Sequence, residues 1–258
     1  MIFLINDMKF LIQKINGKVT HDFSLALLEA IRYQLWLQNN NNCVVKYINT
    51  IQTGNNDVIV NFKAFHKNYV PVGSVEFVCQ FLKTFYNDLP RPINIPNELI
   101  NVPHFTKRKV FNGNHMNLGN RTGSFFLKDN EKIKSNKTHF VNNPAKNFDS
   151  VGVGNFQISE LINIESEWRA FVYKNKLVGL QNYCGDFTLF PDVTVIDDMI
   201  NAYKSAPIAY TLDVGVNHPD TFIIEVHDFF SCGLYGFTDY NILPHMLYRW
   251  FKNYIKKL

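Results

Sequence analysis

The sequence predicts an α+β fold, with antiparallel sheets that carry helices on one side and a small α/β lobe in front of them. Three observations lead to this prediction. The chain has 258 residues, 46% of them hydrophobic and 19% charged, which is enough apolar material for one large core or two small ones. Helical and strand patterns mix over the first 90 residues. After them come mainly strands with the alternation of antiparallel sheets, followed by helices.

The first 90 residues are expected to form the small α/β lobe. Apolar residues recur at helical spacing from Asp22 to Leu37, with Asp22 or Ser24 as the expected N-cap. A second amphipathic helix is expected after the sequence VPVGS at Val70 to Ser74. The expected elements are, in order, a helix over 22–37, strands over 44–51 and 58–62, and a helix over 75–86.

A proline-rich stretch separates this lobe from the rest of the chain. Residues 90–103 contain Pro90, Pro92, Pro96 and Pro103, and few of their positions are periodic. Because the residue before a proline is disfavoured in a helix, such a stretch is typical of a connection between lobes. We therefore expect a boundary near residue 100, with an N-terminal lobe of residues 1–100 and a second domain of residues 101–258.

The second domain is expected to contain an antiparallel meander, a hairpin and two helices. A tight turn at Lys174 to Lys176 joins two strands, and NHPD at Asn217 to Asp220 joins the last two. The expected elements are strands over 124–128, 156–162, 168–173 and 177–183, a helix over 195–205, strands over 208–215 and 221–227, and a closing helix over 240–256.

Composition excludes several classes of protein. The net charge of +4 is spread along the chain, with no basic run longer than Lys107 to Lys109, so no nucleic-acid partner is expected. Four cysteines without a C-x-x-C pair indicate reduced thiols in the cytoplasm and no zinc site. No stretch of about 18 apolar residues and no leader-like N-terminus are found, so we expect a soluble protein without a membrane helix.

The last pair of strands carries the most informative residues. If NHPD forms a hairpin turn, Asp213 and Glu225 lie nearly opposite each other, and Glu225 and His227 share a face. Two carboxylates among apolar neighbours need a cation, and a divalent ion that bridges phosphates would supply it. The alternative is that Asp213 only closes a turn and that Glu225 faces solvent.

Basic residues offer further candidates, each with a structural alternative. Arg169 lies in a strand, on the face opposite Trp168 and Ala170, where it could hold a phosphate or carboxylate or simply pair with Glu165 or Glu167. Lys128 ends a short apolar strand. It could be a phosphate ligand, or simply a charge at the edge of the sheet. The long loop over 129–150 carries four lysines that could cover an anion or only be solvated: Lys132, Lys134, Lys137 and Lys146.

Other phosphate and hydrolase motifs are missing. The glycines Gly113, Gly119 and Gly123 do not fit the order G-x-x-x-x-G-K-[ST], which excludes a Walker-type NTPase. The eight histidines form no H-E-x-x-H motif and have no triad-like neighbours, so zinc and serine hydrolases have no support.

In their order and spacing, five segments resemble the ATP-grasp superfamily. They are FLK at Phe126 to Lys128, SEL at Ser159 to Leu161, EWRAFV at Glu167 to Val172, YTLDVG at Tyr210 to Gly215, and IIEVHDFFSCGLYGF at Ile223 to Phe237. The likeness covers residues 120–240 and is closest to the clade named for a conserved Arg and two Lys. That clade includes phage and bacterial proteins and a eukaryotic assembly factor for translation initiation. VPVGSVEF at Val70 to Phe77 resembles its pre-grasp region.

The resemblance implies roles for particular residues. Lys128 resembles the strand lysine on the α-phosphate, and Lys134 is the choice for the second lysine, with Lys137 as its rival. Glu160 would lie in the hinge that holds adenine and ribose. Arg169 resembles the arginine that stabilises the transferring phosphoryl group. The magnesium carboxylates are matched by Asp213 and Glu225.

Two positions depart from the family pattern. His227 stands where the superfamily usually has Asn, so either Mn²⁺ is tolerated beside Mg²⁺ or His227 only positions a phosphate. Asp129 replaces the proline that is common after the strand lysine, which affects the expected lid geometry.

The implied function is an ATP- and Mg²⁺-dependent carboxylate–amine ligase. In such a ligase the acid substrate attacks the γ-phosphate, and an amine captures the acyl phosphate to form an amide or peptide-like bond. The acid and amine are not specified by the sequence, and a protein or peptide is among the expected substrates. The alternative is an assembly factor that binds nucleotide without ligase turnover.

Overall fold

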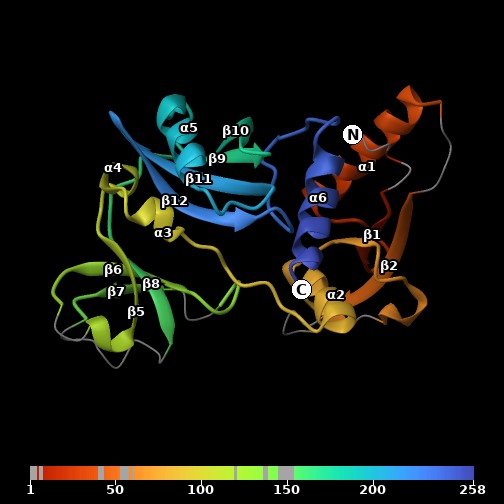
Figure 1. Ribbon diagram of the computed structural model, residues 1–258, viewed down its shortest axis with the longest axis horizontal. Helices are drawn as coiled ribbons and strands as arrows, with labels where there is room; N and C mark the ends of the chain where they lie inside the picture. The colour runs from red at the N-terminus through yellow and green to blue at the C-terminus, as the bar shows by residue number, and fades with distance from the viewer. Residues whose placement is uncertain are drawn as a thin grey trace. The chain divides into compact units, whose positions relative to one another are not determined.

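The computed structural model describes residues 5, 8–39, 44–52, 58–59, 61–118, 121–135, 139–144 and 154–258 (Figure 1). The chain divides into two compact units. Unit 1 consists of Met1–Leu89, Pro207–Ala209 and Phe229–Leu258, and unit 2 consists of Pro90–Ala206 and Tyr210–Asp228. The division into domains at residue 100 stays a prediction. The compact units are not divided at a single position, because the end of the chain packs with its beginning.

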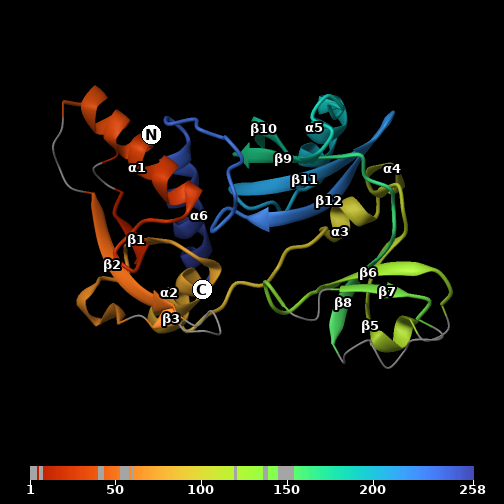
Figure 2. The same ribbon diagram turned by 180° about the vertical axis from the view of Figure 1, so that it is seen from behind.

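Unit 1 is built on a four-stranded sheet with the strand order β3-β2-β1-β4 (Figure 2). Strand β1 pairs in parallel with both β2 and β4, so helix α1 serves as the crossover between β1 and β2. The elements are β1 (Phe10–Ile15), α1 (Asp22–Leu37), β2 (Val45–Gln52), β3 (Val58–Ile59), η2 (Phe62–Ala64), β4 (Val70–Val72), α2 (Val75–Tyr86) and α6 (Leu243–Lys256).

Two of the predicted helices of this unit are confirmed with their bounds, α1 at Asp22–Leu37 and α2 at Val75–Tyr86, and the closing helix expected over 240–256 is α6, which begins at Leu243. The predicted N-cap of α1 is wrong. The cap is His21, whose side chain makes no capping hydrogen bond, and Asp22 instead accepts a hydrogen bond of 3.0 Å from the Leu234 N–H. Strand β1 was not predicted, although its apolar residues are buried in the sheet.

Unit 2 contains two four-stranded sheets, with the orders β10-β9-β11-β12 and β5-β8-β6-β7. The first consists of β9 (Ser166–Tyr173), β10 (Lys176–Gly185), β11 (Ala209–Asn217) and β12 (Asp220–Asp228). The second consists of β5 (Val110–Asn114), β6 (Ser124–Asp129), β7 (His139–Asn142) and β8 (Asn155–Glu160). The helical elements are α3 (Asn97–Ile100), α4 (Pro103–Thr106), η3 (His115–Leu118) and α5 (Val193–Ala202).

The prediction of one antiparallel meander is wrong. Strand β8 pairs with β5 and β6, whereas β9 pairs with β10 in the other sheet. The two hairpins, β9–β10 and β11–β12, are confirmed. The sequence showed the strands, but the change of sheet between Glu160 and Ser166 depends on long-range pairing that a local pattern does not contain.

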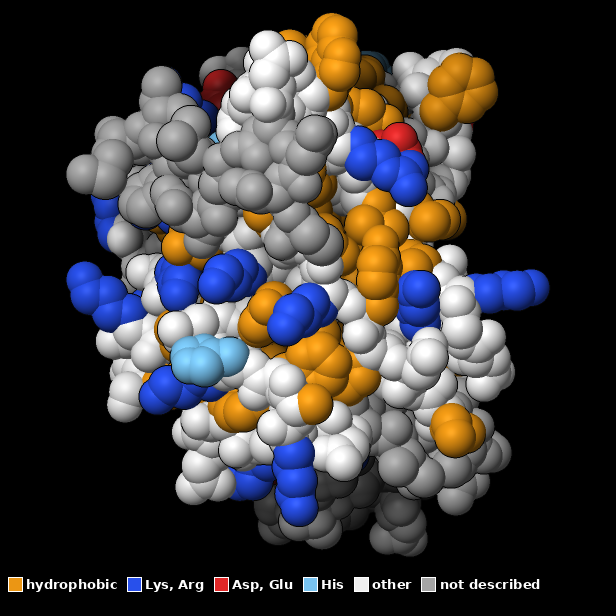
Figure 3. Space-filling model, turned by 90° about the vertical axis from the view of Figure 1, so that its right-hand side faces the viewer, with side chains coloured by type: hydrophobic (Ala, Val, Ile, Leu, Met, Phe, Trp, Pro, Cys, Tyr) orange, Lys and Arg blue, Asp and Glu red, His pale blue; other side chains and the backbone are white. Residues whose placement is uncertain are grey.

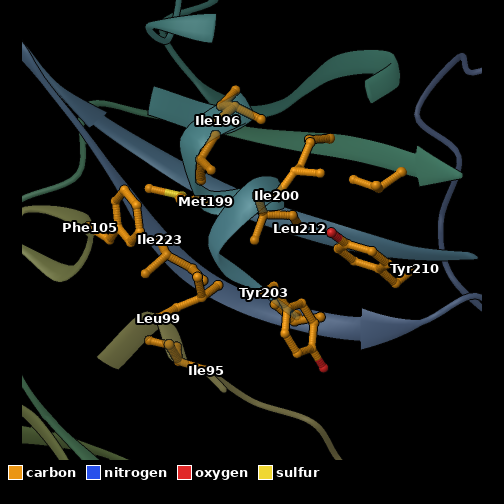
Figure 4. Packing of buried hydrophobic residues seen from close by; sticks show 14 of the residues in the cluster. Ile95, Leu99, Phe105, Ile196, Met199, Ile200, Tyr203, Tyr210, Leu212 and Ile223 are labelled. Carbon is orange, nitrogen blue, oxygen red and sulfur yellow. The ribbon is translucent and has the colours of Figure 1, made fainter. Parts of the chain in front are cut away.

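The main core of unit 2 lies on one face of the sheet β10-β9-β11-β12. Helix α5 contributes Ile196, Met199 and Ile200, which pack with Leu212 and Ile223 of the strands (Figure 4). Successive strand residues point to opposite faces. The residues between the core positions therefore lie on the other face, and the polar side chains discussed below belong to it.

Within the described residues, no helix combines the length and the apolar character that crossing a lipid bilayer requires.

Candidate functional site

The β11–β12 hairpin brings the predicted acidic residues together. Asp213 pairs with Glu225 in the antiparallel register, and an irregularity follows directly between Asp213 and Val214. Ligand atoms of Asp213, Glu225 and His227 all lie within 4.8 Å of one another. The expected opposition of the two carboxylates is confirmed, and Glu225 does not simply face the solvent, because its side chain is only 21% exposed.

Arg169 of β9 forms a two-pronged ion pair with Asp213. Its Nε donates to Oδ1 at 2.8 Å and its Nη2 to Oδ2 at 2.7 Å. The side chains are 8% and 1% exposed, so both charges are buried and depend on each other. Trp168 and Ala170 belong to the core on the other face, as the strand alternation predicts. The structure thus pairs Arg169 with Asp213, a partner that the sequence did not suggest.

Lys128 reaches the same cluster from the other sheet. It lies near the end of β6, and its Nζ contacts Oε2 of Glu225. His227 Nε2 lies 2.6 Å from the other carboxylate oxygen, Oε1. The side chain of Lys128 is 16% exposed and that of His227 is 40% exposed, so the cluster opens to solvent on the histidine side. The second sheet thus supplies a cation to the carboxylates of the first.

The cationic neighbours determine the ionisation of Glu225. Burial alone would raise the pKa of this carboxyl group, but the charge of Lys128 and the hydrogen bond and charge of His227 outweigh burial. The pKa of Glu225 therefore lies well below its ordinary range, and the group is an anion at neutral pH. An anionic carboxylate is the form that binds a metal ion.

Tyr183 of β10 extends the cluster and was missed by the sequence reasoning. The guanidinium carbon of Arg169 lies over its ring, 5.6 Å from the ring centre. Its hydroxyl donates a hydrogen bond to Glu167 Oε2 at 2.6 Å. Burial raises the pKa of Tyr183, as do the negative charges of Asp213, Glu167 and Glu225, so the hydroxyl keeps its proton. Strand alternation counted from the turn would have put Tyr183 on the opposite face, because the register of β10 shifts between Leu177 and Gly179.

Asn94, in the segment that was predicted to be a simple connection, joins the two sheets beside this cluster. Its carbonyl accepts from the Val226 N–H at 2.8 Å, and its Nδ2 donates to the Asp129 carbonyl at 3.1 Å. Asn94 is 6% exposed and has a φ of 54°, a conformation that asparagine tolerates better than most residues. Asp129 and Val226 directly follow Lys128 and Glu225 in the sequence. One residue therefore holds the strand positions next to both.

The remaining predicted residues lie at other places in unit 2. Glu160 ends β8, where its Oε2 accepts from the Lys109 N–H at 3.1 Å and its side chain is 40% exposed. Lys134 lies beyond the end of β6, with an exposed side chain and a φ of 52°. Lys132 is also exposed. Lys137 and Lys146 lie outside the described residues.

The donor set of the hairpin fits a hard divalent ion. It consists of two carboxylates and one imidazole, with ligand atoms close enough together for one ion to contact all three after a small adjustment. Each carboxylate is already paired with a protein cation, Asp213 with Arg169 and Glu225 with Lys128. A bound ion would therefore share or replace these cations, and the freed basic groups would be available to an anion.

The fold and this arrangement of charges define a class of protein, the ATP-grasp proteins. The profile of one ATP-grasp domain family, the second family of the clade with a conserved Arg and two Lys, matches residues 105–244. The chain belongs to this family. No curated protein sequence is detectably similar to it.

Solved structures agree on the fold. D-alanine–D-alanine ligase from Bacillus anthracis is 10% identical over 97% of this chain and 99% of that chain, with a TM-score of 0.53. The same ligase complexed with ATP is 9% identical over the same shares, with a TM-score of 0.51. N5-carboxyaminoimidazole synthetase from Staphylococcus aureus is 10% identical over 85% of this chain and 71% of that chain, with a TM-score of 0.50. At these identities the likeness shows an ATP-grasp ligase-like fold.

Proposed function

We propose that this protein binds ATP with Mg²⁺ and joins a carboxylate to an amine. The observation that carries the proposal is the convergence of Asp213, Glu225 and His227 with Lys128 and Arg169 on one sheet face of an ATP-grasp family member. Phosphoryl transfer requires positioned cations and a metal site more than a catalytic base, and the residues of this cluster would supply both.

The chemistry of each side chain suggests its role in binding the metal ion or the nucleotide. Asp213 and Glu225, with His227 beside them, would hold Mg²⁺, or Mn²⁺ because imidazole is a softer ligand. When bound, the ion neutralises charge on the phosphate oxygens. Lys128 and Arg169 would hold phosphate oxygens, since both are cations with donors that face the cluster. Lys134, or Lys137 as its rival, is proposed as the second lysine and Glu160 as the group that holds adenine and ribose.

The proposed reaction has two steps. The carboxylate of the acid substrate attacks the γ-phosphorus of ATP, and ADP leaves with the electrons of the broken bond. The amine then attacks the carbonyl carbon of the acyl phosphate, an amide bond forms, and phosphate leaves while the amine gives up a proton. Arg169 is suited to the first step because its charge is permanent and delocalised over a planar group. A peptide or protein is included among the proposed substrates.

The charges of the cluster predict that nucleotide and metal bind together. Without ligands, two cations balance two carboxylates. Mg²⁺ alone would be repelled by the positive charges of Lys128 and Arg169. ATP alone would be repelled by the negative charges of Asp213 and Glu225. When both bind, the ion takes the carboxylates and the phosphates take the basic groups. We therefore expect ATP and Mg²⁺ together to raise the melting temperature by more than the sum of their separate effects.

The test is thermal unfolding with ATP, with Mg²⁺ and with both, on the wild type and on Asp213→Asn and Glu225→Gln. Both variants should lose most of the rise. Asp220→Asn is a matched control on the same hairpin, since Asp220 pairs with Lys107 at the surface. An unchanged melting curve at millimolar MgATP would contradict nucleotide binding. ADP release that needs an acid and an amine supports the ligase, whereas a nucleotide-dependent rise without ADP release in any substrate mixture supports the assembly factor.

A further inference from the structure

One stretch of unit 2 is acidic in a chain that is basic as a whole. Residues 177–203 contain four aspartates and no Lys, Arg or His, which gives this stretch a net charge of −4, against +4 for the entire chain. Elsewhere basic groups predominate, and the face in Figure 3 shows more Lys and Arg than Asp and Glu side chains. The acidic stretch covers β10 from its second residue, the loop that follows it and α5.

The same stretch exposes large apolar side chains. In the loop between β10 and α5, Phe187 is 72% exposed and Phe190 is 60% exposed, and Val193 at the start of α5 is 38% exposed. A single exposed apolar residue needs no explanation, but two phenylalanines within four positions of an ordered loop are a feature of interaction surfaces.

Several hydrogen bonds hold this loop in place. Asp186 Oδ1 accepts from the N–H and the Oγ1 of Thr188, at 2.8 and 2.7 Å. Trp168 Nε1 donates to the Leu189 carbonyl at 3.0 Å, and its ring meets that of Phe190 edge-on at 4.7 Å between centroids. The Asp192 N–H donates to Thr221 Oγ1 at 2.8 Å. A partner would therefore meet a preorganised surface and would not have to order the loop.

The entry to the loop is fixed by Gly185. Its φ is 75°, and a Cβ atom there would lie 2.2 Å from the Glu165 carbonyl oxygen. Only glycine allows this approach of the two backbones. The backbone that leads into Phe187 is therefore fixed by its close contact with the backbone of Glu165.

We propose that this surface binds a basic peptide segment of a partner protein. We call it the Phe187 surface, and it consists of Phe187, Phe190 and Val193 with Asp186, Asp192, Asp197 and Asp198. Within the described part of the chain, none of these four carboxylates is in an ion pair. Lysine and arginine suit such a surface because their stems cover apolar rings while their charges meet the carboxylates and the ring faces.

The negative charge of the Phe187 surface disfavours other classes of partner. Nucleic acids and anionic lipid surfaces carry phosphate, and four exposed carboxylates would repel them. An acidic peptide is disfavoured for the same reason. The binding proposed here does not need ATP, so it goes beyond the proposed ligase function and can fail or succeed independently of it.

The test measures the binding of a fluorescein-labelled peptide of alternating lysines and leucines to the full chain without nucleotide. Its counterpart has glutamate in place of lysine. We expect the basic peptide to bind and the acidic one not to bind. Phe187→Ser/Phe190→Ser should weaken binding of the basic peptide by at least about fivefold, because aromatic anchors carry much of the free energy of binding at such surfaces. Raising the salt concentration from about 0.05 to about 0.5 M should also weaken it.

Two further variants separate the surface from general effects. Asp197→Asn/Asp198→Asn removes two charges that are not used in the hydrogen bonds of the loop, and it should weaken binding of the basic peptide. Trp36→Ser, at a side chain of α1 that is 71% exposed, is the control and should leave binding unchanged. Equal losses in the control and the Phe187 surface variants would overturn the proposal, as would equal binding of both peptides or no binding of the basic peptide to the wild type.

Discussion

Lys128 and Glu225 lie 97 residues apart in the sequence and on different sheets of unit 2, yet their charged groups are in contact. Each alone would be a poorly solvated charge, since their side chains are 16% and 21% exposed. The contact joins β6 to the hairpin that carries both carboxylates. It therefore links the stability of the unit to the charge state of the candidate site.

The pair can be tested by a double-mutant cycle. We expect Lys128→Met to lower the free energy of unfolding by about 2–3 kcal/mol, because Glu225 then stays partly buried with His227 as its remaining partner. The double variant Lys128→Met/Glu225→Leu should recover a large part of this loss, because neither charge remains. Urea unfolding of the wild type, both single variants and the double variant measures the coupling. Additive losses would show that the contact contributes nothing.

Arg169 gives a second prediction that concerns the metal. Arg169→Met leaves Asp213 buried without its two-pronged partner and should cost about 3–5 kcal/mol. Because the carboxylates then lack one cation, Mg²⁺ alone should raise the melting temperature of this variant by more than that of the wild type. Arg169→Lys keeps the charge, so its response to Mg²⁺ should stay close to that of the wild type. Equal responses of Arg169→Met and the wild type would argue against a metal at Asp213.

Local patterns predicted the parts of the site but not their assembly. The turn NHPD indicated the hairpin, but a regular register counted from it would pair Asp213 with Ile224 and leave Glu225 on the other face. The register shift between Asp213 and Val214 is what brings Asp213 opposite Glu225. The same reasoning could not find that Asp213 pairs with Arg169, or that Lys128 comes from a second sheet. Both contacts depend on which strands become neighbours. Asn94 was missed because its role lies in two backbone contacts that its sequence neighbours do not indicate.

Asn94 gives a third prediction, on the positions of the two strands. Asn94→Asp keeps a residue that tolerates a positive φ, but it places a carboxylate oxygen where Nδ2 donates to the Asp129 carbonyl. Asn94→Gly keeps the backbone conformation and removes the side chain. We expect Asn94→Asp to be the less stable of the two by about 1–2 kcal/mol.

The same two variants test whether Asn94 positions the site. Both should weaken the rise in melting temperature caused by MgATP, since Lys128 and Glu225 precede the residues that Asn94 holds. Gln157→Ala is the comparison. The Gln157 side chain forms hydrogen bonds of 2.9 and 2.8 Å with the backbone N–H and carbonyl of Ile95, the residue that follows Asn94. If all three variants lose stability but respond fully to MgATP, Asn94 is only structural.

Tyr210 gives a prediction on pH. It is fully buried in the core of unit 2, and its hydroxyl has no hydrogen-bond partner among the described residues. Burial raises the pKa of Tyr210 above its ordinary value of about 10. Above that pH the unfolded chain loses the proton while the folded chain keeps it. The folded state then binds more protons than the unfolded state, so the stability falls as the pH rises.

Tyr210→Phe should therefore change stability in two ways. At neutral pH it removes an unpaired buried hydroxyl, so the variant should be as stable as the wild type or more stable by about 1 kcal/mol. Above about pH 10 its stability should fall less steeply, by up to about 1.4 kcal/mol per pH unit, because one of the buried tyrosines no longer titrates. Urea unfolding at several pH values measures both effects. Tyr47→Phe, at a ring that is 42% exposed, is the control, and an identical alkaline slope in Tyr210→Phe and the wild type would refute the assignment.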